Sequence, residues 1–439
     1  MSQTLRSIPS VERILSGKAF AALVEGYGRP RVKEAVTAHL DELRAAGGAW
    51  EEGEAVADIA IRLRLAMAST LRRVVNATGV IIHTNLGRSP IDRTLWSDAA
   101  DVVTGYSNLE FDLEQGERGA RDEHLAELCR SLFGCEAAIL TNNNAAGTLL
   151  MLAATAAGSD VLVSRGELVE IGGSFRVPDV IQQGGARLRE VGTTNRTRAR
   201  DYATAVDAQT AAILRVHRSN FSMMGFTETT SIAELIAVAR EKRVPLLYDE
   251  GTGRVVDISK YGFEKHETVR ELIAAGVDAV ACSTDKLIGA TQGGLILGRE
   301  EIIAKCRKHP LMRALRAGKE SYAVIAETLR AFATDRHEER VPIYRMLSTS
   351  VDALRERAQS LGATTIIDSR CALGGGTTPT ETVSSIAIHV EGNANERYTR
   401  FLKNDPPIVG RIVDDRFILD MRTLLEDDLP HVAHAIATA

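Results

Sequence analysis

The prediction of the fold rests on the stretch Ala279-Val280-Ala281-Cys282-Ser283-Thr284-Asp285-Lys286-Leu287-Ile288-Gly289 and on Gly293-Gly294-Leu295-Ile296-Leu297-Gly298 shortly after it. Small and β-branched residues lead into a Ser-Thr-Asp turn, a single lysine follows, and a glycine-rich loop precedes a second apolar run. This pattern predicts a buried strand that places one amine at the end of a sheet. Burial lowers the pKa of a lysine, which suits Schiff-base chemistry at Lys286. A surface lysine on a strand-to-loop turn would show the same short pattern.

Two further stretches favour the chemical interpretation. The apolar run Val244–Tyr248 ends in Asp249, and Lys286 follows 37 positions later. An acid and a lysine at strand ends are the arrangement of pyridoxal phosphate enzymes, in which the acid keeps the ring nitrogen protonated and the lysine holds the aldehyde. The polar turn 141–144 lies between an apolar strand and a helix, where free backbone N–H groups can bind a phosphate.

Length and composition set the class of the protein. The 439 residues predict two or three domains, and 44% hydrophobic with 25% charged residues is ordinary for a globular protein. No apolar run is long enough for a membrane span and the N-terminus has no apolar leader, so we expect a cytoplasmic protein that does not contact a membrane. Neither the five cysteines nor the ten histidines have metal-ligand spacing, and we expect no metal and no disulfide framework.

Between residues 123 and 298 helical and strand patterns alternate, which predicts a mainly parallel sheet covered by helices. Ligands bind at the carboxyl ends of such strands. Polar turns fall at these ends, at 142–144, 192–195 and 217–220 as well as at Asp249 and Lys286. We expect helices near 122–133, 145–157, 171–183 and 231–241, and strands at 137–140, 160–164, 186–191, 210–216, 244–248 and 279–282.

The chain is predicted to have three domains. Residues 1–75 form a small helical module, 76–318 a large α/β domain, and 319–439 a smaller α/β domain. The smaller domain begins with a long helix over 319–340 and contains strands at 364–368 and 384–390 and a hairpin over 410–421 that turns at Asp414-Asp415. The helical module, with exposed arginines, is either a packing or oligomerisation arm or an RNA-contacting module.

Motifs throughout the chain resemble one family, the bacterial selenocysteine synthases, or L-seryl-tRNA(Sec) selenium transferases, which are pyridoxal phosphate enzymes of fold type I. The resemblance includes the N-terminal module and covers nearly the whole chain. The Gly-Thr-Thr-Asn-Arg-Thr stretch with Asp-Lys-Leu downstream is its most specific part. The motifs are Thr78-Gly79, His83–Arg88, Gly105–Glu110, Asp112–Gly116, Asn142–Ala146, Glu190–Thr197, Gly225–Glu228, Asp285-Lys286-Leu287 and Asp405-Pro406-Pro407.

The resemblance implies a role for each of a set of residues. Lys286 binds the aldehyde of pyridoxal 5'-phosphate, Asp249 faces the ring nitrogen, and Asn143, Asn144 and Ala145 lie at the cofactor phosphate. The hydroxyl that leaves is protonated by Asp285 or His217, and the choice between them stays open. An anion pocket for selenophosphate is formed by Arg88, Arg121, Arg313, Arg316, Thr193 and Thr194.

The implied reaction converts L-seryl-tRNA(Sec) to L-selenocysteinyl-tRNA(Sec) by β-replacement, through an aminoacryl-tRNA intermediate. The implied partners are the seryl-charged selenocysteine tRNA, held by the helical module, selenophosphate, and further copies of the chain in a ring-shaped decamer built from dimers. Two other functions fit the motifs. A related lyase acting on a free amino or amino-sugar acid would use Lys286 and Asp249 without needing residues 1–75. A non-catalytic tRNA-binding homologue would keep the fold alone.

Overall fold

The computed structural model describes residues 8–172 and 175–439, and the chain divides after Arg73 into two compact units that are described separately. The described part of the first unit packs four α-helices and a short 3-10 helix around one apolar core that includes Phe20 and Leu40. Its third helix begins after Gly28, carries Pro30 in its first turn and ends at Gly47. The helices are α1 (Val11–Leu15), α2 (Ala21–Tyr27), α3 (Arg29–Ala46) and α4 (Glu52–Met67), which confirms the predicted helical module.

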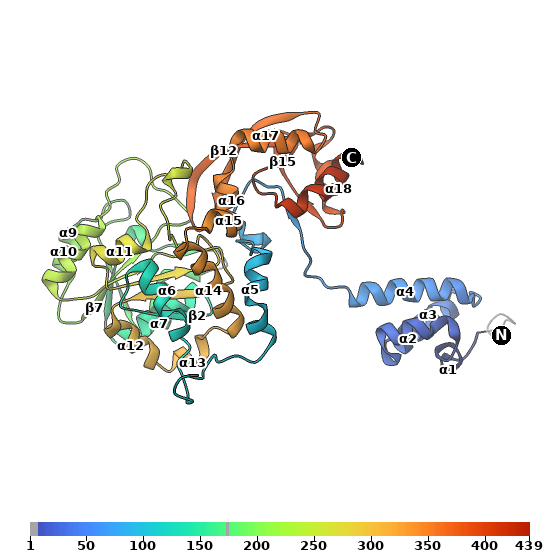
Figure 1. Cartoon of the computed structure of the whole chain (residues 1–439), viewed down its shortest axis with the longest axis horizontal. Coiled ribbons are helices and arrows are strands. Elements are labelled where there is room, and N and C mark those ends of the chain that lie inside the picture. The colour runs from blue at the N-terminus through green and yellow to red at the C-terminus, as the bar shows by residue number, and fades with distance from the viewer. Residues whose placement is uncertain (1–7, 173–174) are drawn as a thin grey trace. The chain divides into compact units, whose positions relative to one another are not determined.

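The second unit is organised around a seven-stranded sheet in the order β2-β10-β9-β8-β7-β3-β6. Two of these strands, β2 and β7, are labelled in Figure 1. Every neighbouring pair is parallel except the pairs of β10, which is antiparallel to both β2 and β9. The predicted, mainly parallel sheet is therefore confirmed. Its strands are β2 (Ala137–Thr141), β3 (Asp160–Ser164), β6 (Arg187–Val191), β7 (Thr210–Val216), β8 (Leu246–Asp249), β9 (Ala279–Ser283) and β10 (Gly294–Gly298).

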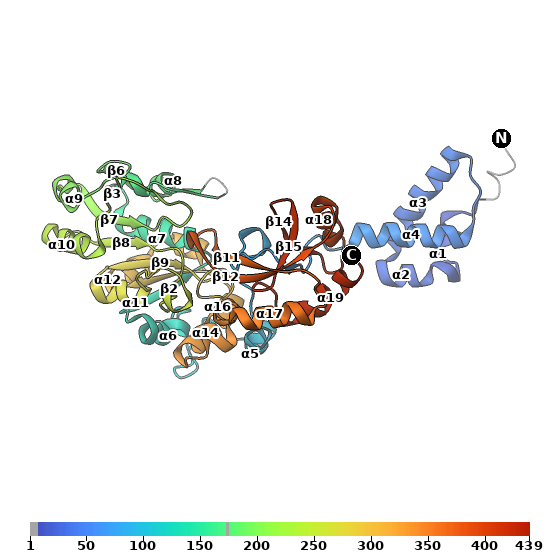
Figure 2. The same cartoon turned by 90° about the horizontal axis from the view of Figure 1, so that it is seen from above.

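Helices cover both faces of this sheet. Alternate side chains of β2 point to opposite cores: Ala138 and Leu140 to one, Ala137 and Ile139 to the other. Figure 2 shows α6 and α7 on opposite sides of the strands. The first core is closed by α6 (Glu123–Phe133), α9 (Ala199–Ala205), α10 (Ile232–Lys242), α11 (Val269–Ala275) and α14 (Lys319–Ala333), and the second by α7 (Asn144–Ala156), α8 (Val177–Gln183), α12 (Glu300–Lys308) and α13 (Leu311–Leu315).

A four-stranded antiparallel sheet in the order β11-β12-β15-β14 forms a smaller lobe of the same unit. The hairpin of β14 (Arg411–Val413) and β15 (Arg416–Asp420) turns at Asp414-Asp415 as predicted, with both residues at positive φ. The lobe also contains α16 (Pro342–Ser348), α17 (Val351–Ser360), α18 (Ala394–Leu402) and α19 (Leu429–Ala437), while α5 (Arg93–Thr104) packs on α14 and β1 (Val75–Asn76) pairs with β13 (Ile408–Val409).

The first hairpin of the smaller lobe is longer than the sequence pattern indicated. The strands expected at 364–368 and 384–390 extend to β11 (Ile366–Gly374) and β12 (Thr378–Val390). Figure 2 shows this hairpin extending from the smaller sheet toward the large one. The glycine loop at its tip therefore reaches the carboxyl edge of the large sheet, where Gly376 contacts Lys286.

The helix expected over 319–340 is interrupted. The backbone of Asp335 has a left-handed φ of 54°, a conformation that an α-helix cannot accommodate. The N–H of Arg336 bonds back to Ala331 O, which closes the helix end. The chain resumes as the separate short helix α15 (His337–Arg340). The prediction of one continuous helix is therefore wrong at this turn.

The helix expected near 171–183 is shorter than predicted. Its described N-terminal part forms the two-residue strands β4 (Glu170–Ile171) and β5 (Phe175–Arg176), and α8 begins only at Val177. Pro178 accounts for this start, because proline fits the first turn of a helix but not its interior. Residues 173–174 lie outside the described part of the chain. Across 8–172 and 175–439, no helix combines the length and apolar character that crossing a bilayer requires.

Candidate active site

The carboxyl edge of the large sheet brings together the turns that follow β2, β8 and β9, because these strands run in one direction. Lys286 lies three residues beyond β9 and is 8% exposed. Its Nζ donates a hydrogen bond to Gly376 O at 3.1 Å, and its own carbonyl accepts one from Ser89 Oγ at 2.6 Å. The amine is thus held inside the protein by a carbonyl of the smaller lobe.

The environment of Lys286 changes its acid–base behaviour. Burial lowers the pKa of the amine, and the guanidinium of Arg88 lowers it further. The carboxylates of Asp249, Asp285 and Glu250 act in the opposite direction without cancelling the shift. A lowered pKa leaves more of the amine neutral near pH 7, and the neutral amine is the form that attacks a carbonyl carbon.

Asp249 ends β8 and is buried, with 5% of its surface exposed. Its Oδ1 accepts a hydrogen bond from Asn144 Nδ2 at 2.8 Å. Burial raises the pKa of the Asp249 carboxyl, and the bond from Asn144 only partly opposes this. A cation placed against Asp249 would stabilise its charged form, so the site is suited to a protonated ring nitrogen.

The N-terminus of α7 lies beside Asp249. Asn143 caps it, because Asn143 Oδ1 accepts a bond from Ala146 N at 2.9 Å. Among the described residues no protein group accepts from the backbone N–H groups of Asn144 and Ala145. Free N–H groups at the start of a 13-residue helix, together with the helix dipole, form a site for a phosphate.

The loop at the tip of the β11–β12 hairpin closes over Lys286. Gly376 has a φ of 86°, a left-handed conformation that favours glycine, and a Cβ there would lie 2.8 Å from Lys286 Nζ and displace the end of the lysine side chain. Its N–H bonds to Ser219 O at 3.2 Å. Three buried polar atoms around this point have no partner among the described residues: Asn144 Oδ1, Ser219 Oγ and Thr378 Oγ1. Unpaired polar atoms of this kind fit a site built for a polar cofactor.

His217 follows β7 and contacts the same loop, with Nε2 donating to Thr377 O at 3.0 Å. Burial lowers the pKa of His217, and therefore the imidazole is neutral near pH 7. The ring of His266 packs nearly perpendicular to that of His217, with centroids 6.4 Å apart. The structure thus places His217 at the edge of the site but gives its Nε2 proton an acceptor in the protein.

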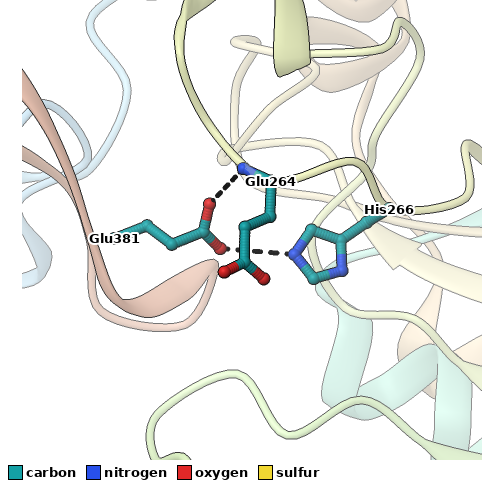
Figure 3. Close-up of side chains that lie close together, drawn as sticks. All are labelled: Glu264, His266 and Glu381. Carbon is teal, nitrogen blue, oxygen red and sulfur yellow. Dashed lines mark hydrogen bonds and ion pairs between the residues drawn. The ribbon is translucent and has the colours of Figure 1, made fainter.

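A small polar cluster supports His266 (Figure 3). His266 Nε2 lies 3.2 Å from Glu381 Oε1, and Glu381 Oε2 accepts a bond from Glu264 N at 2.6 Å. Ligand atoms of the three side chains lie within 4.8 Å of one another, a spacing that a metal ion could bridge. Both oxygens of Glu381 are already hydrogen-bonded, however, and these bonds account for the cluster as a link between the loop before α11 and β12.

The four arginines of the predicted anion pocket are divided into separate groups. Arg88, with a left-handed φ of 62°, forms an ion pair at 2.5 Å with Asp285, the residue before Lys286. Arg121 and Arg316 meet at the carboxylate of Glu110, at 2.7 Å and 2.9 Å. Arg313, in α13, makes no ion pair within the described residues. Arg88 is therefore the arginine that the structure places next to the lysine.

Thr193 and Thr194 lie after β6, the edge strand of the sheet, and both are exposed. Thr193 N and Oγ1 bond to the backbone of Arg196, and the carbonyl of Thr194 closely approaches Gly166. Neither threonine contacts Lys286 within the part of the chain that the structure describes. The two remain predicted site residues that the fold of one chain does not bring against the amine.

Sequence reasoning missed two features of the site. One is the glycine loop with Thr377 and Thr378, which supplies the carbonyl partner of Lys286 from 90 positions away. Three consecutive glycines at 374–376 were the available signal, since such a run permits close backbone approach. The other is Glu110, which gathers two of the predicted pocket arginines and showed no signal beyond its place in a motif.

The sheet order, the antiparallel β10, the smaller lobe and a buried lysine and acid at the carboxyl edge define an enzyme of fold type I, as predicted. The solved structure of a D-glucosaminate-6-phosphate ammonia-lyase has this fold, with a TM-score of 0.63 over 86% of this chain and 98% of that one, at 22% identity.

Sequence comparisons identify the family. The model of L-seryl-tRNA selenium transferase matches residues 74–425, and the model of the selenocysteine synthase N-terminal region matches residues 5–44. The L-seryl-tRNA(Sec) selenium transferase of Geobacter sulfurreducens is 46% identical over 98% of each chain. The L-seryl-tRNA(Sec) selenium transferase of Hyphomonas neptunium is 41% identical over 99% of this chain and 98% of its own length. The enzyme of the same name from Carboxydothermus hydrogenoformans is 38% identical over 98% of this chain and 97% of its own length. The chain belongs to the L-seryl-tRNA selenium transferase family.

The lowered pKa of Lys286 predicts how its modification depends on pH. Reductive methylation of the cofactor-free protein, followed by mass spectrometry of the Lys286 peptide, should give a midpoint below the ordinary lysine value of 10.5. Arg88→Gln removes a cation that disfavours the charged amine, so its midpoint should lie higher than that of the wild type. A wild-type midpoint at or above 10.5, or a lower midpoint in Arg88→Gln, would contradict this account of the site.

Proposed function

We propose that the protein converts L-seryl-tRNA(Sec) to L-selenocysteinyl-tRNA(Sec), replacing the seryl hydroxyl by selenium from selenophosphate. The observation that carries the proposal is the buried Lys286 amine at the carboxyl edge of the sheet, whose pKa is affected by the charges of Arg88, Asp249 and Asp285. Membership of the selenium transferase family over nearly the whole chain supports the choice of substrate.

Pyridoxal 5'-phosphate is the cofactor of this function. Lys286 would hold its aldehyde, Asp249 its ring nitrogen, and Asn143, Asn144 and Ala145 its phosphate, at the N-terminus of α7. When bound, this cofactor withdraws electrons from the amino acid, which allows the α-proton to leave and the β-substituent to be exchanged. A protonated ring nitrogen beside Asp249 would oppose the effect of burial, which raises the pKa of this carboxyl, and the charged carboxylate would in turn keep the nitrogen protonated.

Lys286 also acts as the base. Its lowered pKa leaves a larger share of free Nζ neutral, and a neutral amine at this position can accept the proton from the seryl Cα. Arg88 contributes to the lowered pKa of Lys286, because its positive charge disfavours a second cation beside it. Gly376 O, which accepts a bond from Nζ, keeps the amine oriented while no substrate is present.

A proton is also needed by the seryl hydroxyl as it leaves. Asp285 and His217 remain the two candidate donors. His217 is neutral near pH 7 and its Nε2–H is bonded to Thr377 O, so donation from it requires that bond to break. Asp285 precedes Lys286 in the chain and its Oδ2 accepts a hydrogen bond from Arg88 Nη1, so donation from it would require this ion pair to open.

Selenophosphate would bind to the predicted anion pocket. A guanidinium presents two parallel N–H donors that match phosphate oxygens, and the charge of several arginines would stabilise the phosphate as it departs. Arg88 is already positioned near Lys286 by its bond to Asp285. The other proposed pocket residues are Arg121, Arg313, Arg316, Thr193 and Thr194.

The helical unit that ends at Arg73 would bind the selenocysteine tRNA, and the chain would act as a homo-oligomer, a ring-shaped decamer. The match of this region to a selenocysteine synthase N-terminal model supports its assignment to the tRNA. Functionally, residues 76–318 would hold the cofactor and 319–439 would close over it, since Gly376 already reaches Lys286.

Product analysis tests the reaction. Full-length protein loaded with pyridoxal phosphate should convert seryl-tRNA(Sec) and selenophosphate to selenocysteinyl-tRNA, and Lys286→Ala should lower the rate by at least a thousandfold, because it removes both the cofactor anchor and the base. Hydrolysis of the tRNA ester and mass spectrometry of the amino acid give the readout. Deamination of a free amino or amino-sugar acid without action on seryl-tRNA would instead identify a lyase.

Truncation tests the role of the helical unit. A gel-shift titration should show tight binding of selenocysteine tRNA by the full chain and at least tenfold weaker binding by residues 74–439, because the truncated chain lacks the proposed tRNA contacts. Cofactor absorption serves as the control that the truncated protein is folded. Equal tRNA affinity of the two proteins would contradict the assignment, and tRNA binding by a chain that takes up no cofactor would indicate a non-catalytic homologue.

A further inference from the structure

Glu110 lies where arginines from separate segments converge. Its Oε1 accepts a hydrogen bond from Arg121 Nε at 2.7 Å and another from Arg316 Nη1 at 2.9 Å. Arg118 Nη2 approaches the second oxygen, Oε2, at 3.4 Å. One carboxylate is thus surrounded by three guanidiniums, two of which belong to the proposed anion pocket.

This arrangement adjoins the carboxyl edge of the large sheet. Arg316 forms a β-bridge with Thr141, the last residue of β2, and Leu315 O accepts a bond from Asn142 N at 2.8 Å. Arg121 Nη1 donates to Ala317 O at 2.7 Å. The backbone of Arg316 is therefore fixed to the turn that leads into the N-terminus of α7, and the guanidinium of Arg121 is fixed to the residue that follows Arg316.

The charges at this point do not balance. Three guanidiniums face a single carboxylate, so the group has a surplus of positive charge that can accept a further anion or a more highly charged one. The hydrogen bond from Arg121 is the main cause of a lowered pKa at Glu110, which is therefore ionised at neutral pH. The side chains of Glu110, Arg121 and Arg316 are 31%, 20% and 27% exposed, and solvent can reach the ion pairs.

We propose that Glu110 is an internal counter-ion of the anion pocket, which keeps Arg121 and Arg316 in place while the pocket is empty and is displaced by the phosphate group of the selenium donor. This inference rests on the proposed function, because it takes these two arginines as ligands of that phosphate. Glu110 itself is not a catalytic residue; it acts through the arginines.

The exchange of one anion for another explains why a carboxylate belongs here. Unpaired guanidiniums would repel each other and move apart, whereas Glu110 holds two of them around a single oxygen. A phosphate group brings more oxygens and more negative charge than a carboxylate, and so it can replace Glu110 at the same donors. Competition by Glu110 also weakens the binding of the phosphate product, which favours its release.

The variant Glu110→Gln tests this role, because it removes the charge and keeps the shape. Isothermal titration of the full-length, cofactor-loaded protein with inorganic phosphate should show about tenfold tighter binding by the variant, the scale expected when one like charge is removed a few ångströms from a bound anion. Phosphate should also inhibit turnover of the variant more strongly, with a lower KM for selenophosphate. Loss of a merely structural ion pair would not tighten binding.

Two further variants separate the possible outcomes. Glu426→Gln makes the same change of net charge at an ion pair with Arg357 in the smaller lobe and should leave phosphate binding unchanged. Arg316→Gln should weaken it. If Glu110→Gln binds phosphate as the wild type does or more weakly, while Arg316→Gln binds it more weakly, the proposed role of Glu110 is wrong but the anion pocket stands. If Arg316→Gln binds phosphate normally, or the wild type binds none, the proposed anion pocket is wrong as well.

Discussion

The burial of one amine is the constraint on which the rest of this structure depends. Transferring an ammonium group from water into a protein interior is unfavourable, and within residues 8–172 and 175–439 the Lys286 amine has one hydrogen-bond partner, the carbonyl of Gly376. The protein resolves this by lowering the pKa of the amine, through burial and the nearby guanidinium of Arg88. The same surroundings that disfavour the charged form therefore increase the share of the neutral amine, which is the nucleophilic form.

Keeping the amine in this position needs segments from across the chain. Ser89 bonds to the carbonyl of Lys286, Asp249 lies at the end of the neighbouring strand β8, and Gly376 covers the amine from the smaller lobe. The parallel direction of the strands gathers the first contributions at one edge of the large sheet. The long β11–β12 hairpin adds the last, so the site is complete only when both sheets have formed.

Local patterns were sufficient to predict the sheet and its central pair of residues. Apolar runs that end in polar turns mark both β8 with Asp249 and β9 with Lys286. The partners of these residues could not be predicted in this way, because the contact with Gly376 depends on the length of a distant hairpin. Likewise, the sequence shows arginines on loops, but not that Arg121 and Arg316 share the carboxylate of Glu110. The helix end near Asp335 depends on a left-handed backbone conformation at this one residue, and aspartate adopts that conformation only occasionally.

Adding pyridoxal phosphate to the cofactor-free protein and recording the visible spectrum tests the role of the Lys286 amine most directly. The wild type should develop the absorption of lysine-bound cofactor at roughly 420 nm. Gly376→Ala adds a Cβ close to Lys286 Nζ and should weaken the band strongly. The control is Gly362→Ala, which also places alanine at a positive φ but has no atom within 4 Å of the added Cβ, and it should behave like the wild type. Lys286→Ala should show no band at all. A band of normal strength in Lys286→Ala would contradict the claim that this amine is the reactive centre.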